Sequence, residues 1–233
     1  MRVKLPRPKF KAVLFDLDGT LIEFKFPIRE SRRAIIQFLK ESGFDVTDFS
    51  ENMRTQDLVD SAWSQWQNSD ALKSLDFGKL KSRLHHILDD FEFKSMPTAK
   101  PFPSCLKVVE KLKQIGSLVG IVTNSGRGPA QAILDDYGFL PYLNLVITRN
   151  EMSRMKPSPD GLLQAQRILG LNSLDMLYVG DSVLDIESAR SANMKCAAIP
   201  TGLHPVEELR KLSPDYVLER LSDIENLVIH DAS

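Results

Sequence analysis

The sequence has little cysteine, no long hydrophobic run and almost no net charge. Its only cysteines, Cys105 and Cys196, lie far apart and lack CxxC or histidine spacing. They predict neither a disulfide framework nor a zinc site, and we interpret both as small, reduced hydrophobic residues. The 30 basic and 31 acidic side chains give a formal net charge of -1, which excludes a broad basic surface for nucleic acid or an anionic membrane.

The apolar segments are also too short to cross a membrane. Basic residues are frequent in the first eleven positions, but the apolar run behind them, residues 12–15, is too short for a signal peptide or a membrane span. We therefore expect a cytoplasmic protein. At 233 residues the chain is long for one compact unit, so one domain with an insertion, or two unequal domains, is expected.

Short apolar runs alternate with helical patterns along most of the chain. The predicted strands are 12–15, 118–122, 145–148, 176–179, 196–199 and 216–218, and the predicted helices are 105–115, 130–137, 160–169 and 185–192. Glycines follow the last apolar residue of three of these helices, as C-terminal caps do, at Gly116, Gly138 and Gly170. This alternation predicts an α/β fold with a doubly wound parallel sheet and right-handed crossovers.

Residues 24–98 break this rhythm, because they carry long helical patterns and no convincing strand. We expect helices near 28–41, 51–66 and 80–91. The apolar face that other helices or the sheet must cover is formed by Leu58, Val59, Ala62, Trp63 and Trp66. The sequence therefore predicts an inserted helical domain at 24–98 between the two parts, 1–23 and 99–233, of the α/β domain.

Two carboxylates follow the first predicted strand. Asp16 and Asp18 are separated by one residue and precede a Gly19-Thr20 turn. Alternate residues of a strand share a face, so at the end of the strand both acids can approach one bound substrate. This spacing suits metal-assisted phosphoryl transfer, in which one acid attacks and the other handles protons. The alternative is an acidic turn whose short side chains only satisfy backbone groups.

Polar clusters follow the next two predicted strands. Ligands of an open parallel sheet collect at the carboxyl ends of its strands, where Thr123, Asn124 and Lys156 are expected. The Thr123 hydroxyl and the following backbone N–H groups could bind phosphate oxygens, and Lys156 could offset the phosphate charge. Alternatively, Thr123, Asn124 and Ser125 only begin a helix, with Ser125 as its cap, and Lys156 is a solvated loop lysine.

A second acidic pair follows the strand at 176–179. Gly180 permits a close backbone approach, and Asp181 is expected where the acids of the first strand point. Magnesium takes oxygen ligands, including a few carboxylates and substrate phosphate, so Asp181 is a candidate Mg²⁺ ligand. Asp185, one helical turn further on, would lie near Lys156 or a metal-bound water. Alternatively, it is an acidic residue favoured by the dipole in the first turn of a helix.

These clusters, in this order, resemble the motifs of the haloacid dehalogenase superfamily. The four motifs are matched by DLDGTL at 16–21, TNS at 123–125, KP at 156–157 and GDSVLD at 180–185, and the resemblance covers essentially the whole chain. The helical insertion after the first motif resembles the phosphoglycolate-phosphatase-like branch. The resemblance implies a Rossmann-like catalytic core with a helical cap domain that closes over the site and excludes water.

The resemblance also implies a role for each candidate residue. Asp16 would be the nucleophile that forms an aspartyl-phosphate, and Asp18 would be the general acid and base. Asp181 would bind Mg²⁺ together with Asp16 and the main-chain carbonyl of Asp18. The residues implied to bind the substrate phosphate are Thr123, Asn124 and Lys156, with Asp185 supporting Lys156 or the metal.

The expected activity is magnesium-dependent hydrolysis of a small organic phosphate monoester. Hydrolytic dehalogenases of the superfamily lack the second aspartate, so Asp18 favours phosphate chemistry. Two alternatives stay open: a phosphomutase acting on a sugar phosphate, and a regulator that binds a phosphate ester without turnover. Many relatives continue after Leu21 with Asp and then Ser or Thr, whereas residues 22–24 here are Ile-Glu-Phe. Neither a particular substrate nor an oligomeric state is therefore assigned.

Overall fold

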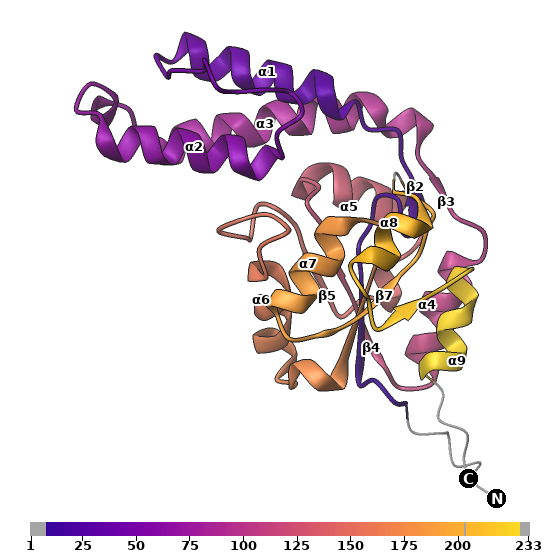
Figure 1. Cartoon of the computed structure of the whole chain (residues 1–233). Coiled ribbons are helices and arrows are strands. Elements are labelled where there is room, and N and C mark those ends of the chain that lie inside the picture. Colours follow the sequence, from indigo (N-terminus) through magenta and orange to yellow (C-terminus); the bar gives the residue numbers. More distant parts are fainter. Residues whose placement is uncertain (1–7, 203, 229–233) are drawn as a thin grey trace, which may run out of the picture. The chain divides into compact units, whose positions relative to one another are not determined.

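The computed structural model describes residues 8–202 and 204–228. The chain divides into two compact units: Met1–Phe24 together with Thr98–Ser233, and Lys25–Pro97. The first unit is an α/β structure and the second is helical (Figure 1). Three of the basic residues near the N-terminus, Arg2, Lys4 and Arg7, lie outside the described residues.

Six parallel strands form the sheet of the α/β unit, in the order β5-β4-β1-β6-β7-β8. Their bounds are β1 Ala12–Phe15, β4 Leu118–Val122, β5 Leu145–Ile147, β6 Met176–Gly180, β7 Lys195–Ala198 and β8 Tyr216–Val217. The central strand is β1, whose Ala12 is in register with Leu118 on one side and Met176 on the other. Because the strand order runs outward from β1 in both directions, the sheet is doubly wound, and the predicted fold class with its helical insertion is confirmed.

Helices pack on both faces of this sheet. Their bounds are α4 Cys105–Gln114, α5 Arg127–Asp136, α6 Asp160–Leu169, α7 Val183–Ser191, α8 Val206–Lys211 and α9 Ile224–Val228. Figure 1 shows α6 and α7 on one face and α4 and α9 on the other. On the first face, Leu162 and Ile186 pack in one cluster with Leu14 and Tyr178 of the sheet. Gly170 ends α6 in the left-handed conformation, with φ 64°, as predicted.

Two short strands, β2 and β3, were not predicted from the sequence. β2, Ile22–Glu23, pairs antiparallel with β3, Lys100–Pro101, and Lys100 Nζ lies 3.0 Å from Glu23 Oε2. Each strand has two residues, which is too short to show a hydrophobic period. They hold together the two chain segments that lead into and out of the helical unit. Short 3₁₀ turns lie at Leu72–Ser74, Met96–Thr98, Leu140–Tyr142, Ser173–Asp175 and Leu221–Asp223.

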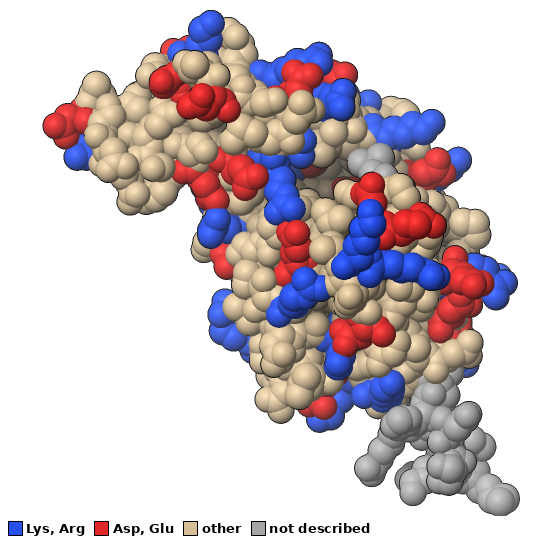
Figure 2. Space-filling view, in the orientation of Figure 1, with Lys and Arg blue, Asp and Glu red and all other residues tan. Residues whose placement is uncertain are grey.

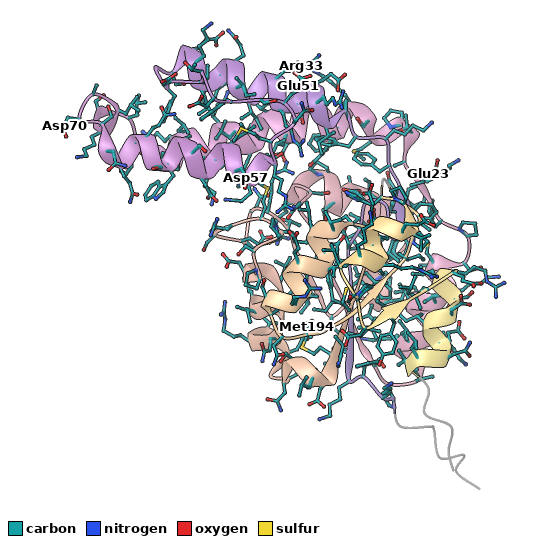
Figure 3. The ribbon with its side chains drawn as sticks, in the orientation of Figure 1. Glu23, Arg33, Glu51, Asp57, Asp70 and Met194 are labelled. Carbon is teal, nitrogen blue, oxygen red and sulfur yellow. The ribbon has the colours of Figure 1, made fainter. Side chains whose placement is uncertain are left out.

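The helical unit consists mainly of α1 Ile28–Glu41, α2 Thr55–Asn68 and α3 Phe77–Ser95. Its core contains side chains from all three helices, among them Ile35, Leu39, Leu58, Ala62 and Leu84. Outside this core, Arg33 donates two hydrogen bonds of 2.7 Å to the Glu51 carboxylate (Figure 3). This pair fixes the loop before α2 to α1.

Within the helical unit, two helix starts differ from the predicted ones. The α3 helix begins three residues before the predicted start, because the Asp76 side chain caps it by accepting a hydrogen bond of 3.1 Å from Lys79 N. The α2 helix begins four residues after the predicted start, because the N–H groups of Asn52 and Met53 bond to Ser50 in a separate turn. In both places a local polar contact, rather than the apolar pattern, decides the boundary.

The predicted apolar face of α2 is only partly covered. Leu58, Val59 and Ala62 are buried, but Trp63 is 40% exposed. The Trp63 ring stacks on Trp66 at a centroid distance of 5.0 Å and meets the edge of Phe77 at 4.7 Å. Trp63 therefore contributes to the unit through these two rings and keeps one side in water, as large aromatic residues often do.

Both charges occur on the face of the molecule that Figure 2 shows. Acidic and basic side chains are interspersed over the face seen in Figure 2, and no large patch of one sign lies there. Cys105 and Cys196 are free and buried, as expected. Within the described ranges, no helix combines the length and the apolar character that crossing a bilayer requires.

At Gly161, α6 packs too closely against its neighbours to leave room for a side chain. A Cβ atom at this position would lie 2.7 Å from Val122 Cγ1 and 2.8 Å from Met152 Sδ. Both neighbours are buried. We therefore expect Gly161→Ala to lower the free energy of unfolding by about 1–3 kcal/mol in urea denaturation. The matched control is Gly78→Ala, also at the second residue of a helix but exposed, where a Cβ would meet only the exposed Asp76 side chain, at 3.2 Å, and stability should change by less than ~1 kcal/mol. Equal effects of the two substitutions would contradict this account.

Candidate active site

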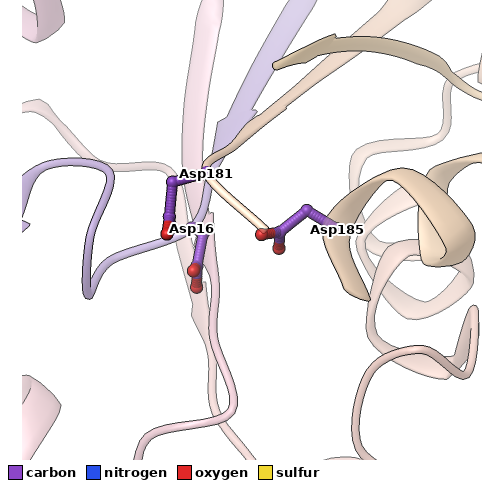
Figure 4. A group of neighbouring side chains, drawn as sticks. All are labelled: Asp16, Asp181 and Asp185. Atoms are coloured by element: carbon purple, nitrogen blue, oxygen red, sulfur yellow. The ribbon is translucent and has the colours of Figure 1, made fainter. Parts of the chain in front are cut away.

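The candidate residues lie at the carboxyl ends of the central strands. Asp16 follows β1, Thr123 follows β4 and Asp181 follows β6, and because these strands are adjacent and parallel, their ends meet at one edge of the sheet. Among the described residues, Asp16, Asp181 and Asp185 each offer a carboxylate oxygen within 4.8 Å of the other two. Figure 4 shows the three side chains converging from the strand ends and from the start of α7.

Lys156 joins two of these acids. Its Nζ lies 2.7 Å from Asp16 Oδ1 and 2.7 Å from Asp185 Oδ1, and it donates a hydrogen bond of 2.9 Å to Tyr178 Oη. An ammonium group has three N–H donors, so each of them has a partner here. Lys156 is 4% exposed and is therefore not a solvated loop lysine. Its cis peptide bond with Pro157 precedes α6.

Burial and charge shift the pKa values of the four ionisable groups. Burial raises the pKa of Asp16 to about 6, although the Lys156 charge opposes this. Burial and the charges of Asp185 and Asp16 raise the pKa of Asp181 well above its ordinary value. Burial alone would raise the pKa of Asp185, but the charge and hydrogen bond of Lys156 lower it below its ordinary value. Burial likewise opposes the charge on Lys156, but the two carboxylates outweigh it and raise the pKa of the ammonium group.

The same ion pair thus has unequal effects on its two partners. Two carboxylates stabilise the charged form of Lys156. Asp16, in contrast, has one ammonium partner, and the like charge of Asp185 lies close by. Burial and this like charge together explain why the pKa of Asp16 rises despite the ion pair. The raised pKa of Asp16, about 6, lies below neutral pH, on the side of the ionised form that both a nucleophile and a metal ligand require.

Asp185 has all its acceptor capacity directed at neighbours within the α/β unit. Its Oδ1 accepts hydrogen bonds from Lys156 Nζ and from Tyr178 Oη at 2.9 Å. Its Oδ2 accepts from Ser182 N at 3.0 Å and Ser182 Oγ at 2.5 Å, which completes a capping box at the start of α7. Asp185 therefore contacts Lys156 and also stabilises the first turn of its helix, and its supporting role in the site stays a prediction.

Asp16 and Asp181 are the carboxylates best placed for a metal ion. Thr20 Oγ1 donates a hydrogen bond of 2.9 Å to Asp181 Oδ1. The turn at Gly19, with φ 85°, passes so close that a Cβ there would lie 2.5 Å from Asp181 Oδ2, and only glycine fits. Two buried carboxylates side by side repel each other, and a hard divalent cation with oxygen ligands would remove that repulsion. The residues present therefore fit a divalent cation.

Asp18 points to the loop after β4. Its Oδ2 accepts a hydrogen bond from Ser125 Oγ, and Thr123 Oγ1 in turn donates to Ser125 Oγ at 3.2 Å. The Asn124 side chain donates to Lys156 O at 3.2 Å and accepts from Lys156 N at 2.8 Å. The Thr123 hydroxyl and the Asn124 amide thus form hydrogen bonds within and between the loops after β4 and β5. Direct contact of these side chains with phosphate stays a prediction.

Three residues of this network were given no role in the site by the sequence analysis. Tyr178 was included only in a buried strand, Thr20 only in a turn, and Ser125 was considered as a helix cap. The structure places the N-cap of α5 at Gly126 instead, without a side-chain cap bond. The available signals were a hydroxyl in an otherwise apolar strand for Tyr178, and membership of the DLDGTL and TNS motifs for Thr20 and Ser125.

The sheet, the order of its site loops and the clustered acids define the class of protein. The chain belongs to the haloacid dehalogenase-like hydrolase family, whose model matches residues 10–193. The resemblance that the motifs predicted is thereby confirmed, and so is the expected class, a hydrolase of the phosphatase type.

Individual relatives of this class are similar to the chain over nearly their whole length. The chain is 27% identical to the N-acetylmuramic acid 6-phosphate phosphatase of Pseudomonas aeruginosa, over 92% of this chain and 93% of that protein. It is 28% identical to the pyrophosphatase PpaX of Oceanobacillus iheyensis, over 94% and 96%. The crystal structure of a predicted phosphoglycolate phosphatase from Haemophilus somnus matches with a TM-score of 0.63 at 23% identity, over 94% of this chain and 98% of that one, which supports the fold.

Proposed function

We propose that the protein is a magnesium-dependent phosphatase that hydrolyses a small organic phosphate monoester through an aspartyl-phosphate at Asp16. The observation that carries the proposal is the buried network in which Lys156 lies 2.7 Å from both Asp16 and Asp185, with Asp181 in the same acidic cluster. An ionised acid, a buried cation and a set of oxygen ligands are what phosphoryl transfer requires, because it depends on positioning and charge neutralisation.

In the first half-reaction, a carboxylate oxygen of Asp16 attacks the phosphorus. The bond between phosphorus and the leaving oxygen breaks, and Asp18 gives its proton to that oxygen, so the alcohol departs and the phosphoryl group stays on Asp16. Lys156 holds Asp16 and offsets the charge of the phosphate. When bound by Asp16 and Asp181, Mg²⁺ would neutralise phosphate oxygens and align the ester with the nucleophile.

In the second half-reaction, Asp18 takes a proton from water as the water oxygen attacks the phosphorus of the acyl phosphate. The bond between phosphorus and the Asp16 oxygen breaks, inorganic phosphate leaves and Asp16 is again a carboxylate. Asp18 ends the cycle protonated, as it began, because the proton it gave to the alcohol is replaced by one from water, so the steps balance. One residue can therefore act as acid and then as base.

Substrate choice is expected to depend on residues 24–98, which we interpret as the cap domain. The names of the relatives suggest N-acetylmuramic acid 6-phosphate and pyrophosphate for the first assays, beside phosphoglycolate. The proposal is tested by a magnesium-supplemented screen of these compounds and of other phosphate esters. Inorganic phosphate is measured for every compound, and alcohol is measured as well for the esters, because pyrophosphate releases none. Equal release of alcohol and phosphate from an ester supports the proposed hydrolysis. A rearranged sugar phosphate without released phosphate would instead show a mutase, and binding without any turnover would show a regulator.

Asp181→Asn tests the metal site through stability. Removing one buried like charge should leave the metal-free protein at least as stable as the wild type, because Asp181 repels Asp16 and Asp185. Mg²⁺ at about 100 times its Kd should stabilise the wild type by about 2.7 kcal/mol, or roughly 5–10 °C in Tm, and should leave the variant nearly unchanged.

The matched control for this measurement is Asp215→Asn, a carboxylate outside the cluster that pairs with Lys195 at 2.5 Å. This control should keep the full response to Mg²⁺. If Asp181→Asn responds to Mg²⁺ as the wild type does, Asp181 is not a ligand and the proposed site is wrong.

A further inference from the structure

Ser125 lies between the end of β4 and the start of α5, as the last residue of the TNS motif. It is buried, with 6% of its surface exposed. Its hydroxyl does not cap α5, whose N-cap is Gly126, and donates instead to Asp18 Oδ2. The Ser125 hydroxyl therefore bonds to a residue after another strand, β1, and not to the backbone of the helix that it precedes.

The hydrogen-bond directions around Ser125 form a short chain. Thr123 Oγ1 donates to Ser125 Oγ at 3.2 Å and accepts from Ser125 N at 3.1 Å. A hydroxyl carries one hydrogen, so Ser125, which accepts from Thr123, has its own hydrogen directed at Asp18. Oxygen Oδ2 of Asp18 is therefore held as an acceptor, and the proton that Asp18 transfers is carried on Oδ1.

The backbone of Ser125 is fixed by contacts from a third loop. Its carbonyl oxygen accepts a hydrogen bond of 3.2 Å from Arg149 N. The neighbouring carbonyl of Asn124 accepts from Arg149 Nη1 at 3.0 Å. A side chain whose backbone is fixed in this way can hold a catalytic group in one orientation, which proton transfer in a transition state needs.

We propose that Ser125 is a positioning residue that fixes the Asp18 carboxyl group so that its other oxygen delivers the proton to the leaving group. The inference rests on the proposed function and deepens it. It predicts a selective defect: loss of Ser125 slows substrates whose leaving group must be protonated and spares those whose leaving group departs as an anion.

The test compares Ser125→Ala with the wild type on two aryl phosphates in the presence of Mg²⁺. Phenyl phosphate has a poor leaving group that needs a proton, whereas 2,4-dinitrophenyl phosphate has a good one that does not. The quantity compared is kcat/KM, because it reports the steps up to the first irreversible one and not the shared hydrolysis of the intermediate. We expect kcat/KM to fall by about 10- to 100-fold with phenyl phosphate and by less than about 3-fold with dinitrophenyl phosphate.

Two further variants separate positioning from folding. Ser125→Thr keeps the hydroxyl and should restore most of the activity with phenyl phosphate. Ser117→Ala removes another buried serine hydroxyl, which bonds to Phe10 O at 3.1 Å before the opposite end of β4, and should leave the ratio between the two substrates unchanged. A thermal melt of each variant establishes that it is folded.

The outcomes distinguish failure of the Ser125 role from failure of the proposed function. An equal loss on both substrates, or no loss on either, overturns the positioning role of Ser125 while leaving the phosphatase intact. A threonine variant as selective in its defect as the alanine variant also overturns it. If the wild type itself hydrolyses neither aryl phosphate nor any ester of the screen, the proposed function fails, and this inference fails with it.

Discussion

Asp16→Asn is expected to lower kcat by at least about 10³-fold with every substrate that the wild type hydrolyses, because the amide cannot attack phosphorus. The side chain keeps its size and can still accept a hydrogen bond from Lys156, which lies 2.7 Å from Asp16 Oδ1. The fold should therefore survive, as a thermal melt can show. The measurement is steady-state phosphate release in the presence of Mg²⁺.

The control for this variant is Asp175→Asn, which changes an acid in a surface ion pair with Lys11 at 3.0 Å and should leave kcat unchanged. A covalent intermediate also predicts a rapid burst of the aryl alcohol in the wild type when its hydrolysis is the slow step, and this burst should be absent from Asp16→Asn. An Asp16→Asn variant that is folded and turns over at the wild-type rate would mean that another group is the nucleophile.

The centre of the sheet was predictable because its strands are buried on both faces, whereas the edge strands β5 and β8 are partly exposed. The residues of β1 are all fully buried, so its apolar run needs no alternation to be visible, and motifs directly after such runs are placed by the topology itself. The convergence of Asp16 and Asp181 follows from that rule, since their strands are neighbours. The central strands and their polar ends could therefore be located from the sequence.

The finer contacts of the site were not predictable, because they depend on where side chains reach across strands. Tyr178 belongs to an apolar strand, yet its hydroxyl lies 2.9 Å from both Val122 O and Asp185 Oδ1, the two acceptors within reach of its one hydrogen. Ser125 looks like a helix cap, and its hydroxyl bonds to Asp18 instead. In both cases the residue type was consistent with an ordinary local role, and only the packing of β1, β4 and β6 supplies the partner.

Lys156→Met is expected to reduce both stability and activity. It removes the ammonium group from between two buried carboxylates while keeping most of the volume of the side chain. Breaking a buried ion pair in this way leaves charge without compensation and costs about 3–5 kcal/mol in the free energy of unfolding. In the folded fraction we expect kcat/KM to fall by about 10²- to 10³-fold, because the charge that opposes the phosphate is lost. The control, Lys11→Met at the exposed pair with Asp175, should change stability by less than ~1 kcal/mol.

The pH dependence of this loss separates lost charge from lost packing. In the wild type, Lys156 holds the pKa of Asp185 below its ordinary value despite burial, so the pair contributes stability that is present above the ordinary carboxyl pKa and is lost as the pH falls. Without Lys156, burial raises the pKa of both carboxyl groups above their unfolded values, so the penalty grows as the pH rises. The stability gap between wild type and variant in urea denaturation should therefore be larger at about pH 8 than at about pH 5. A stability difference of the same size at both pH values would show that Lys156 stabilises the fold through its packing, and not through its charge on Asp16 and Asp185.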